Sequence, residues 1–287
     1  MLTAEQKALR REGIGGSDIA ALIGVDSFRT PLDVAISKLD GYEPEAAPWL
    51  ERGTFLEAGI ADWYAFRTGS VLKELGTVTH PSEPIALCTP DRIAKKDKWI
   101  DLSIKSPGSF SRDDWGEPET DDVPIAYVIQ IQWELMILEA RGDCDTDHAD
   151  LAALIDGDLA VYRIAADREL QGELLESARK FWRDFIVPRR YPPLNGSKSS
   201  LEWLKRRFPR DSRPIRAATA REELLALELQ EAEEALGRAE KRKAVLASCL
   251  QDQIGKSEAA GIEGAFGRIT WKADKNGNRS FRTRWKK

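Results

Sequence analysis

The chain has 287 residues, 42% of them hydrophobic, and a formal net charge of −5. This length and composition suit one large domain with a full core, or a domain plus an appendage. No apolar run reaches membrane-spanning length, and the three scattered cysteines do not fit a disulfide framework or a zinc site. Only two histidines are present, and the polar start MLTAEQKALRRE is not typical of a signal peptide. We therefore expect a cytoplasmic protein without a membrane anchor.

The first third of the chain predicts helices followed by strands. Helix-starting residues and helical spacing of apolar residues predict helices at 3–12, 13–24, 31–39 and 50–68. Ser17 or Asp18 is a candidate N-cap for the second helix, and Pro31 begins the third. Short apolar runs predict strands at about 71–78, 84–88 and 99–105.

The middle of the chain continues this mixed pattern. Residues 108–123 are acidic and polar and predict a loop, followed by a helix over 124–140. Aromatic and β-branched residues predict a strand over 159–165, and a long helix over 168–187 ends before Pro188. We place the end of a core domain at residue 190.

The remaining residues predict a linker and an appendage. Residues 191–216 are rich in Pro, Arg, Gly and Ser and carry one short helix at 200–207. Residues 217–287 form the appendage: leucines at 3.5-type spacing predict a long helix, either a coiled coil or a helix laid on the body. An Asn-Gly pair at 276–277 between two strand-like runs predicts a β-hairpin.

Residues 89–107, TPDRIAKKDKWIDLSIKSP, carry the clearest chemical signal. Asp91 stands in a turn, and Asp101, Ser103 and Lys105 fall on one face of the following strand because side chains alternate. A carboxylate beside an ammonium group is the pairing that metal-assisted phosphodiester cleavage needs, because a hard cation takes oxygen ligands. The alternative is a surface turn followed by a polar-faced edge strand.

Several ordered blocks resemble one nuclease family. They are RREGIGGSDIAALIG, GTFLEAGIADWY, TPDRI, SIKSP, SRD and YVIQIQWELMI. In order and spacing, they are similar to the lambda-exonuclease-type, or YqaJ-like, phage recombination nucleases of the PD-(D/E)XK superfamily. The resemblance covers about residues 8 to 187. It implies an α/β fold with a restriction-endonuclease-like core, a central mixed β-sheet flanked by helices; the C-terminal helix and β-hairpin lie outside it.

The resemblance also implies roles for individual residues. The catalytic and metal-binding positions of the family fall on Glu57, Asp91, Lys105, the carbonyl of Ile104 and Gln130, with Gln132 as the second choice to Gln130. The positions that hold the terminal 5′-phosphate fall on Arg10 and Ser17, and further phosphate contacts fall on Thr89 and Arg112. Outside the resemblance, these residues could equally be solvated helix positions, an N-cap and neighbours of a core stripe.

One position departs from the family pattern. The strand should carry Glu two residues before Lys105, and Ser103 stands there instead. Serine offers a metal no negative oxygen. Three explanations stay open: Asp101 reaches the metal from the same strand face, Glu57 carries more of the coordination, or the protein is impaired, whether by nature or by an inactivating substitution.

The expected function is a Mg²⁺-dependent 5′→3′ exonuclease, with Mn²⁺ able to substitute, acting on double-stranded DNA ends with a 5′-phosphate. By resemblance we expect a homotrimer and a single-strand annealing protein as partner. The alternatives are a non-catalytic DNA-end-binding protein and a branch-specific endonuclease on the same fold.

The C-terminal segment adds a possible DNA contact. Residues 268–287 hold eight Lys and Arg against one Asp, in alternation with aromatic residues. Arg279 and Arg282 are candidate phosphate contacts, while the aromatic rings either stack on bases or pack on the protein.

Overall fold

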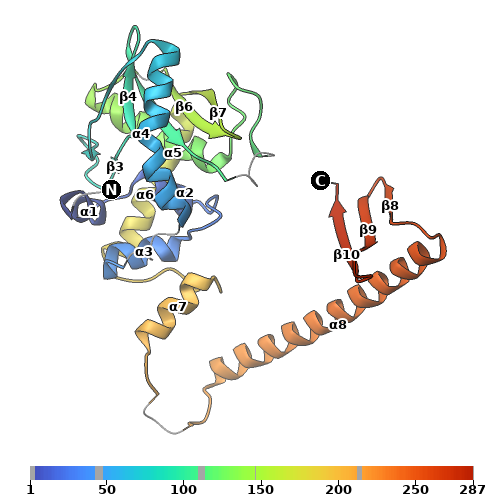
Figure 1. Ribbon diagram of the computed structural model, residues 1–287. Coiled ribbons are helices and arrows are strands. Elements are labelled where there is room, and N and C mark those ends of the chain that lie inside the picture. The colour runs from blue at the N-terminus through green and yellow to red at the C-terminus, as the bar shows by residue number, and fades with distance from the viewer. Residues whose placement is uncertain (1–3, 43–47, 109–113, 146, 212–214, 287) are drawn as a thin grey trace. The chain divides into compact units, whose positions relative to one another are not determined.

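The computed structural model describes residues 4–42, 48–108, 114–145, 147–211 and 215–286 (Figure 1). The chain divides into two compact units, Met1–Pro209 and Arg210–Lys287. The helices of the first unit are α1 (Ala4–Arg11), α2 (Gly16–Leu22), α3 (Pro31–Asp40), α4 (Pro48–Thr68), α5 (Ile125–Arg141), α6 (Arg168–Phe181) and α7 (Lys198–Arg207). A π-helical turn, Trp182–Ile186, continues α6.

A five-stranded sheet forms the centre of the first unit. Its strands are β1 (Val71–Lys73), β4 (Arg92–Lys95), β5 (Trp99–Lys105), β6 (His148–Ile155) and β7 (Asp158–Ala165), in the order β1-β4-β5-β6-β7. β5 and β6 run parallel and the other neighbours run antiparallel, so the sheet is mixed, as predicted. Two short strands, β2 (Val78–Thr79) and β3 (Leu87–Cys88), pair separately.

Helices cover both faces of this sheet. On one face, Ile60 of α4 packs in a cluster with Leu102 and Ile104 of β5; Figure 1 shows α4 lying across the strands. On the other face, Ile131 of α5 packs in a cluster with Leu151 of β6. Because side chains alternate along β5, the odd-numbered residues from 101 to 105 face α5. The predicted core, a central mixed sheet flanked by helices, is confirmed.

Hydrogen bonds from a tryptophan hold the N-terminal segment on this core. The buried indole Nε1 of Trp133 on α5 donates to the carbonyls of Ile14, at 3.2 Å, and Leu87, at 3.1 Å. The N-cap of α2 is Gly15, two residues before the first of the two expected candidates, Ser17 and Asp18. Ser17 and Asp18 lie inside the helix, so the prediction that one of them is the cap was wrong.

The predicted strands differ from the observed ones in three places. The expected strand at 71–78 is two short strands, β1 and β2, joined by an irregular segment. β4 was not predicted, because its four residues, RIAK, are too short to show alternation. β6 was not predicted either, because HADLAALI has no period-two pattern and is fully enclosed between two strands.

Helix α7 packs on the first unit. Trp203 clusters with Leu32 and Ile36 of α3, and its Nε1 donates to Asp40 Oδ2 at 3.0 Å. The short helix predicted at 200–207 is thus present, and the first compact unit extends through it to Pro209.

The second unit is a long helix with a small sheet. α8 (Ala220–Lys256) leads into β8 (Gly261–Gly264), β9 (Gly267–Ala273) and β10 (Arg279–Trp285) in the order β10-β9-β8. The predicted helix and hairpin are confirmed, with β8 as an additional strand. Among the described residues of this unit, Ile254 of α8 and Ile269 of β9 are the buried apolar ones.

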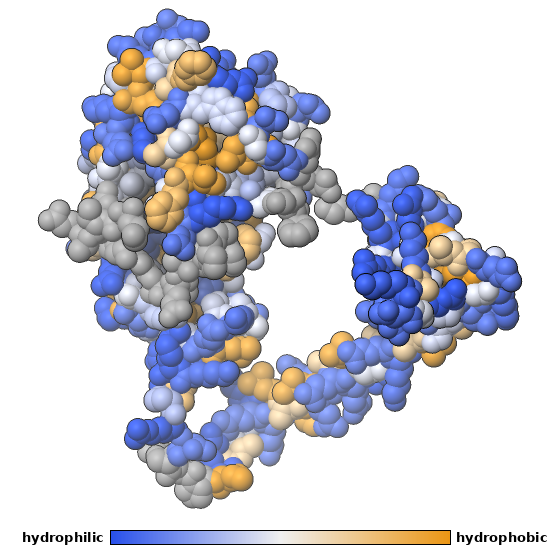
Figure 2. All heavy atoms as spheres, in the orientation of Figure 1, coloured by the Kyte–Doolittle hydropathy of each residue, from blue (hydrophilic) through white to orange (hydrophobic). Residues whose placement is uncertain are grey.

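The surface of α8 is only partly hydrophilic. Figure 2 shows apolar side chains between the charged ones along this helix. The exposed apolar residues are Leu224, Leu225, Leu227, Leu229, Leu236, Val245 and Leu246. None of the helices in the described ranges has the length and apolar character needed to cross a membrane.

Candidate active site

Asp91 and Lys105 meet at the end of β5. Asp91 precedes β4, and its Oδ2 accepts a hydrogen bond from the backbone N–H of Ile104 at 2.7 Å. The same oxygen lies 3.5 Å from Lys105 Nζ, which is also 5.6 Å from the ring centre of Tyr127 on α5. Burial would lower the pKa of Lys105, but the carboxylates of Asp91 and Glu134 outweigh it and raise that pKa. The ammonium group is therefore firmly charged beside a fixed carboxylate.

Glu57 reaches the same region from α4. Arg92 joins Glu57 Oε1, at 3.0 Å, to Glu74 Oε1, at 3.1 Å. Partial burial, followed by the charge of Asp91, raises the pKa of Glu57, although Arg92 and Lys105 offset part of this effect. Arg92 also donates to the carbonyl of Asp91, so one guanidinium connects Glu57 to the turn that carries Asp91.

Asp101 and Ser103 lie deeper on the same strand face. Both are fully buried, and neither the Asp101 carboxylate oxygens nor Ser103 Oγ have a hydrogen-bond partner among the described residues. Burial, then the charges of Glu134 and Asp91, raise the pKa of Asp101 well above its usual range. Burying an oxygen without a hydrogen-bond partner costs free energy. Among the described residues, this face of β5 therefore lacks donors or a cation to pair with these oxygens.

Helix α5 contributes a carboxylate that sequence reasoning missed. Gln130 Nε2 donates to Glu134 Oε1 at 3.0 Å, while Oε2 of Glu134 is buried and unpaired within the described part of the chain. Burial raises the pKa of Glu134 to about 7, even though Lys105 lowers it. The available signal was its position four residues after Gln130, which puts both side chains on one helix face.

Gln132, the second glutamine of YVIQIQWELMI, has a structural role. Gln132 Nε2 donates to the carbonyl of Ala165 at 2.7 Å, and its Oε1 accepts from the N–H of Asp167 at 2.9 Å. Gln132 thus joins α5 to the segment between β7 and α6. Gln130 is the glutamine that lies beside Glu134.

Arg10 and Ser17 lie together as predicted. Arg10 donates to Ser17 Oγ at 3.1 Å. Gly16, the neighbour of Ser17, lies against α5: a Cβ there would be 2.9 Å from Gln130 Cγ and 3.0 Å from Glu134 Oε1. The absence of a side chain at residue 16 therefore lets the Arg10–Ser17 pair approach the carboxylate face.

A buried ion pair stabilises the start of α2, next to Ser17. Asp18 accepts from Lys38 Nζ at 2.7 Å and from Arg29 at 2.9 Å, and both Asp18 and Lys38 side chains are nearly inaccessible. Burial alone would raise the pKa of Asp18, but Lys38 and Arg29 hold it well below its ordinary value. Asp18 also accepts from the N–H of Gly15, which fixes the start of α2.

The remaining predicted contacts are dispersed. Thr89 Oγ1 lies 2.8 Å from Thr77 Oγ1, next to the Pro-Asp turn. Arg112 lies outside the described residues. In the second unit, the Arg279 guanidinium lies 4.2 Å from the ring centre of Trp271, and Arg282 is exposed opposite Thr270.

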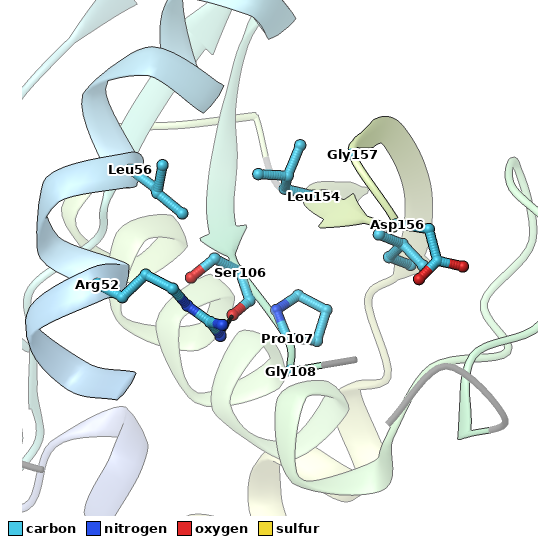
Figure 3. Close-up of a pocket in the computed structure, with 9 residues that line it drawn as sticks. Arg52, Leu56, Ser106, Pro107, Gly108, Leu154, Asp156 and Gly157 are labelled. Atoms are coloured by element: carbon cyan, nitrogen blue, oxygen red, sulfur yellow. Dashed lines mark hydrogen bonds between the residues drawn. The ribbon is translucent and has the colours of Figure 1, made fainter. Parts of the chain in front are cut away.

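A pocket of about 240 Å³ opens next to Lys105 (Figure 3). Arg52 of α4 and Ser106–Gly108, directly after β5, line it together with the turn between β6 and β7. Figure 3 shows the Arg52 guanidinium turned toward Ser106, and Arg52 donates to the Ser106 carbonyl at 2.9 Å. The pocket begins at Ser106, the residue after Lys105, and neither Asp91 nor Lys105 lines it.

The residues fit a divalent cation that takes few protein ligands. Within the described ranges, no group of three or more His, Cys, Asp or Glu side chains could hold a metal ion by itself. The unpaired oxygens of Asp101, Ser103 and Glu134 nevertheless form an electron-rich face beside Asp91. This suits Mg²⁺, which is usually bound by one or two carboxylates and retains several waters.

Comparisons with known proteins show which proteins this chain is similar to. The chain is 29% identical over 204 residues to the uncharacterized protein YqaJ of Bacillus subtilis (strain 168), a match covering 69% of this chain and 61% of that protein. The chain thus spans less than two thirds of the length of this relative.

Solved structures share the fold of the first unit. The alkaline exonuclease LHK-Exo of Laribacter hongkongensis matches with a TM-score of 0.51 and 19% identity, covering 71% of this chain and 97% of that one. Its complex with dAMP matches with a TM-score of 0.52 and 20% identity, over the same shares of the two chains. Residues 5–147 match the model of the YqaJ-like viral recombinase domain, so the predicted resemblance to YqaJ-like proteins is confirmed.

Proposed function

We propose that the chain is a metal-dependent deoxyribonuclease that digests one strand of linear duplex DNA in the 5′→3′ direction and leaves 3′ single strands for phage recombination. The family of residues 5–147 and the fold shared with an alkaline exonuclease support a nuclease. The observation that carries the proposal is the Asp91 carboxylate, held by the Ile104 N–H and lying beside Lys105.

Each side chain at this face has a task in hydrolysis. Lys105 orients the attacking water or stabilises charge on the scissile phosphate, because its ammonium group stays protonated. Gln130, directed at Glu134 from one turn earlier on α5, helps to position water or DNA. Glu57 lies at the margin and accepts from Arg92, which keeps its carboxylate oriented.

A divalent cation completes this arrangement. Asp91 and the main-chain carbonyl of Ile104 would hold it, and when bound it gathers charge and lowers the pKa of a water. We expect Mg²⁺ in cells and activity with Mn²⁺ as well.

The Arg10–Ser17 pair favours reading of a DNA end. Guanidinium and hydroxyl donors suit a terminal 5′-phosphate, and Gly16 brings them close to the carboxylate face. The same geometry favours an exonuclease over a branch-specific endonuclease, because the phosphate site and the cleavage site adjoin each other.

The test uses three DNA substrates with Mg²⁺: a 5′-phosphorylated linear duplex, a 5′-hydroxyl linear duplex and a closed circle. We expect fast digestion of the first, slower digestion of the second and none of the third. Lys105→Met should reduce the rate by at least about 100-fold, whereas Lys96→Met, at an exposed lysine of the turn before β5, should not. Cutting of circles would favour an endonuclease.

A non-catalytic end-binding protein is the second candidate, because Ser103 gives no carboxylate. It predicts binding to 5′-phosphorylated ends without digestion of any of the three substrates.

A further inference from the structure

Ser103 leaves β5 without the carboxylate that the family pattern expects there. Ser103 is fully buried, and its Oγ has no partner among the described residues. It lies between Asp101 and Lys105 on the face of β5 that turns toward α5. A carboxylate that replaces the strand glutamate therefore has to come from α5 or from the strand itself.

Helix α5 presents one carboxylate to this face. Tyr127 packs over Lys105, and seven residues later, two helical turns along the same face, Glu134 reaches the region of Asp101. Gln130 lies between them and donates to one oxygen of Glu134, and the second oxygen has no hydrogen-bond partner in the described part of the chain. Glu134 is 2% exposed, so its second oxygen is shielded from solvent.

Asp101 is a poorer substitute. It is fully enclosed, and its shorter side chain starts four residues before Lys105 on β5. Glu134 has the longer side chain, and its Oε1 accepts from Gln130 and lies against Gly16 at the start of α2. Glu57 is already engaged by Arg92 from the other layer.

We propose that Glu134 on α5 supplies the carboxylate that Ser103 lacks, and that Asp91 and Glu134 together hold the divalent cation. The inference rests on the proposed metal-dependent function, but it concerns the source of the ligand. Two carboxylates and a carbonyl are enough for a cation that keeps several waters, and a small Ser103 leaves space for Glu134. The chain then has a complete metal site, in which one carboxylate ligand comes from α5 instead of β5.

The experiment measures Mn²⁺ binding by calorimetry in the full chain, independently of cleavage. Glu134→Gln keeps the size of the side chain and its acceptor for Gln130, and should weaken Mn²⁺ binding by at least about tenfold. Glu139→Gln, on the exposed side of α5 where Glu139 pairs with Arg168, is the matched control and should bind as the unchanged protein does. Thermal unfolding of each variant checks that it is folded.

A double variant tests the exchange of positions. Ser103→Glu with Glu134→Gln restores the strand carboxylate and should recover Mn²⁺ affinity to within a few-fold. Ser103→Glu alone should give no large gain in cleavage, because the ligand is already present and a second buried carboxylate repels the first. A large gain from Ser103→Glu alone would mean a disabled site and overturn the inference.

The outcomes separate the two proposals. Unweakened Mn²⁺ binding by Glu134→Gln overturns the relocated ligand while digestion of linear DNA by the unchanged chain still supports the nuclease. Mn²⁺ binding that depends on Glu134, without digestion of any DNA, supports the ligand and overturns the nuclease. Anomalous scattering from a Mn²⁺-soaked crystal of the unchanged chain provides a second measurement: an ion contacting Asp101 or Glu57 instead of Glu134 overturns the inference.

Discussion

At the scale of single residues, carboxylates outnumber cations among the described residues of the face between β5 and α5. Asp91, Asp101 and Glu134 surround one ammonium group, Lys105, and burial raises the pKa of both Asp101 and Glu134. A buried carboxylate without a partner is costly, and either a proton or a metal ion can relieve that cost. This excess of negative charge is the physical reason to expect a cation here.

Arg10 offers a direct test of end recognition. We expect Arg10→Ala to reduce the preference for 5′-phosphate over 5′-hydroxyl ends by about 10- to 100-fold, because a charge-assisted hydrogen bond contributes about 1.5–3 kcal/mol. The measurement is kcat/KM on the two linear duplexes. Arg11→Ala is the control, since Arg11 is exposed and donates to the Gly41 carbonyl instead. An unchanged preference in Arg10→Ala would exclude this residue from the phosphate site.

The Asp18–Lys38 pair predicts a pH-dependent stability. Because the folded-state pKa of Asp18 is depressed, its contribution is complete above the unfolded pKa of about 3.9 and is lost as the pH falls toward the folded value. Asp18→Asn should cost about 3–5 kcal/mol at pH 7, because it leaves Lys38 buried without its carboxylate. Urea unfolding at pH 7 and pH 3 measures the difference, which should shrink at pH 3. An equal difference at both values would contradict the assignment.

Part of this site could be foreseen from the sequence and part could not. The Asp91–Lys105 and Arg10–Ser17 pairs follow from motif spacing, and the structure places each pair together. Glu134 was missed because its role depends on which face of β5 meets α5. That orientation follows from the packing of both helices on the sheet, which no local pattern records.

At the scale of elements, local signals were sufficient where an element packs on one side. The helices at α3, α4, α5 and α8 begin or end close to the predicted residues, because capping residues and amphipathic spacing mark them. β6 shows the opposite case. Its inner position between β5 and β7 makes a run such as ADLAAL buried on both faces, which removes the alternation that identifies a strand.

The small sheet of the second unit separates packing residues from candidate DNA contacts. Trp271 pairs with Phe281, and a Cβ at Gly255 of α8 would lie 3.3 Å from Trp271. The face of Trp271 and Ile269 therefore meets α8. Lys272 and Arg282 belong to the opposite face because side chains alternate, and both are exposed.

Neutralising that outer face tests its role. Lys272→Ser with Arg282→Ser should weaken DNA binding and lower the slope of log K against log salt by about 2, if each cation meets one phosphate. Titrations at several salt concentrations measure the slope. Lys241→Ser with Lys243→Ser, which removes the same charge from exposed positions on α8, is the control. An identical slope in both double variants would contradict a specific DNA role for the sheet.

At the scale of the whole molecule, the proposed function requires an acidic chain to bind a polyanion. The formal net charge is −5, yet eight Lys and Arg residues gather over 268–287. Sequence-independent affinity depends on local cations at the phosphate backbone, so an assembly that gathers such segments around DNA can bind despite the overall charge. The resemblance predicts such an assembly, a ring of three chains.

The expected trimer has measurable consequences for mass and processivity. Light scattering should give three times the 32.1-kDa mass of the chain, because enclosure of the duplex needs a closed ring. A ring that encloses its substrate should also finish a bound molecule before it takes another. Adding excess unlabelled duplex after digestion begins should therefore leave the running reactions unaffected. A monomer mass together with immediate inhibition by the competitor would contradict enclosure, because a protein that dissociates after each cut is redistributed among all ends.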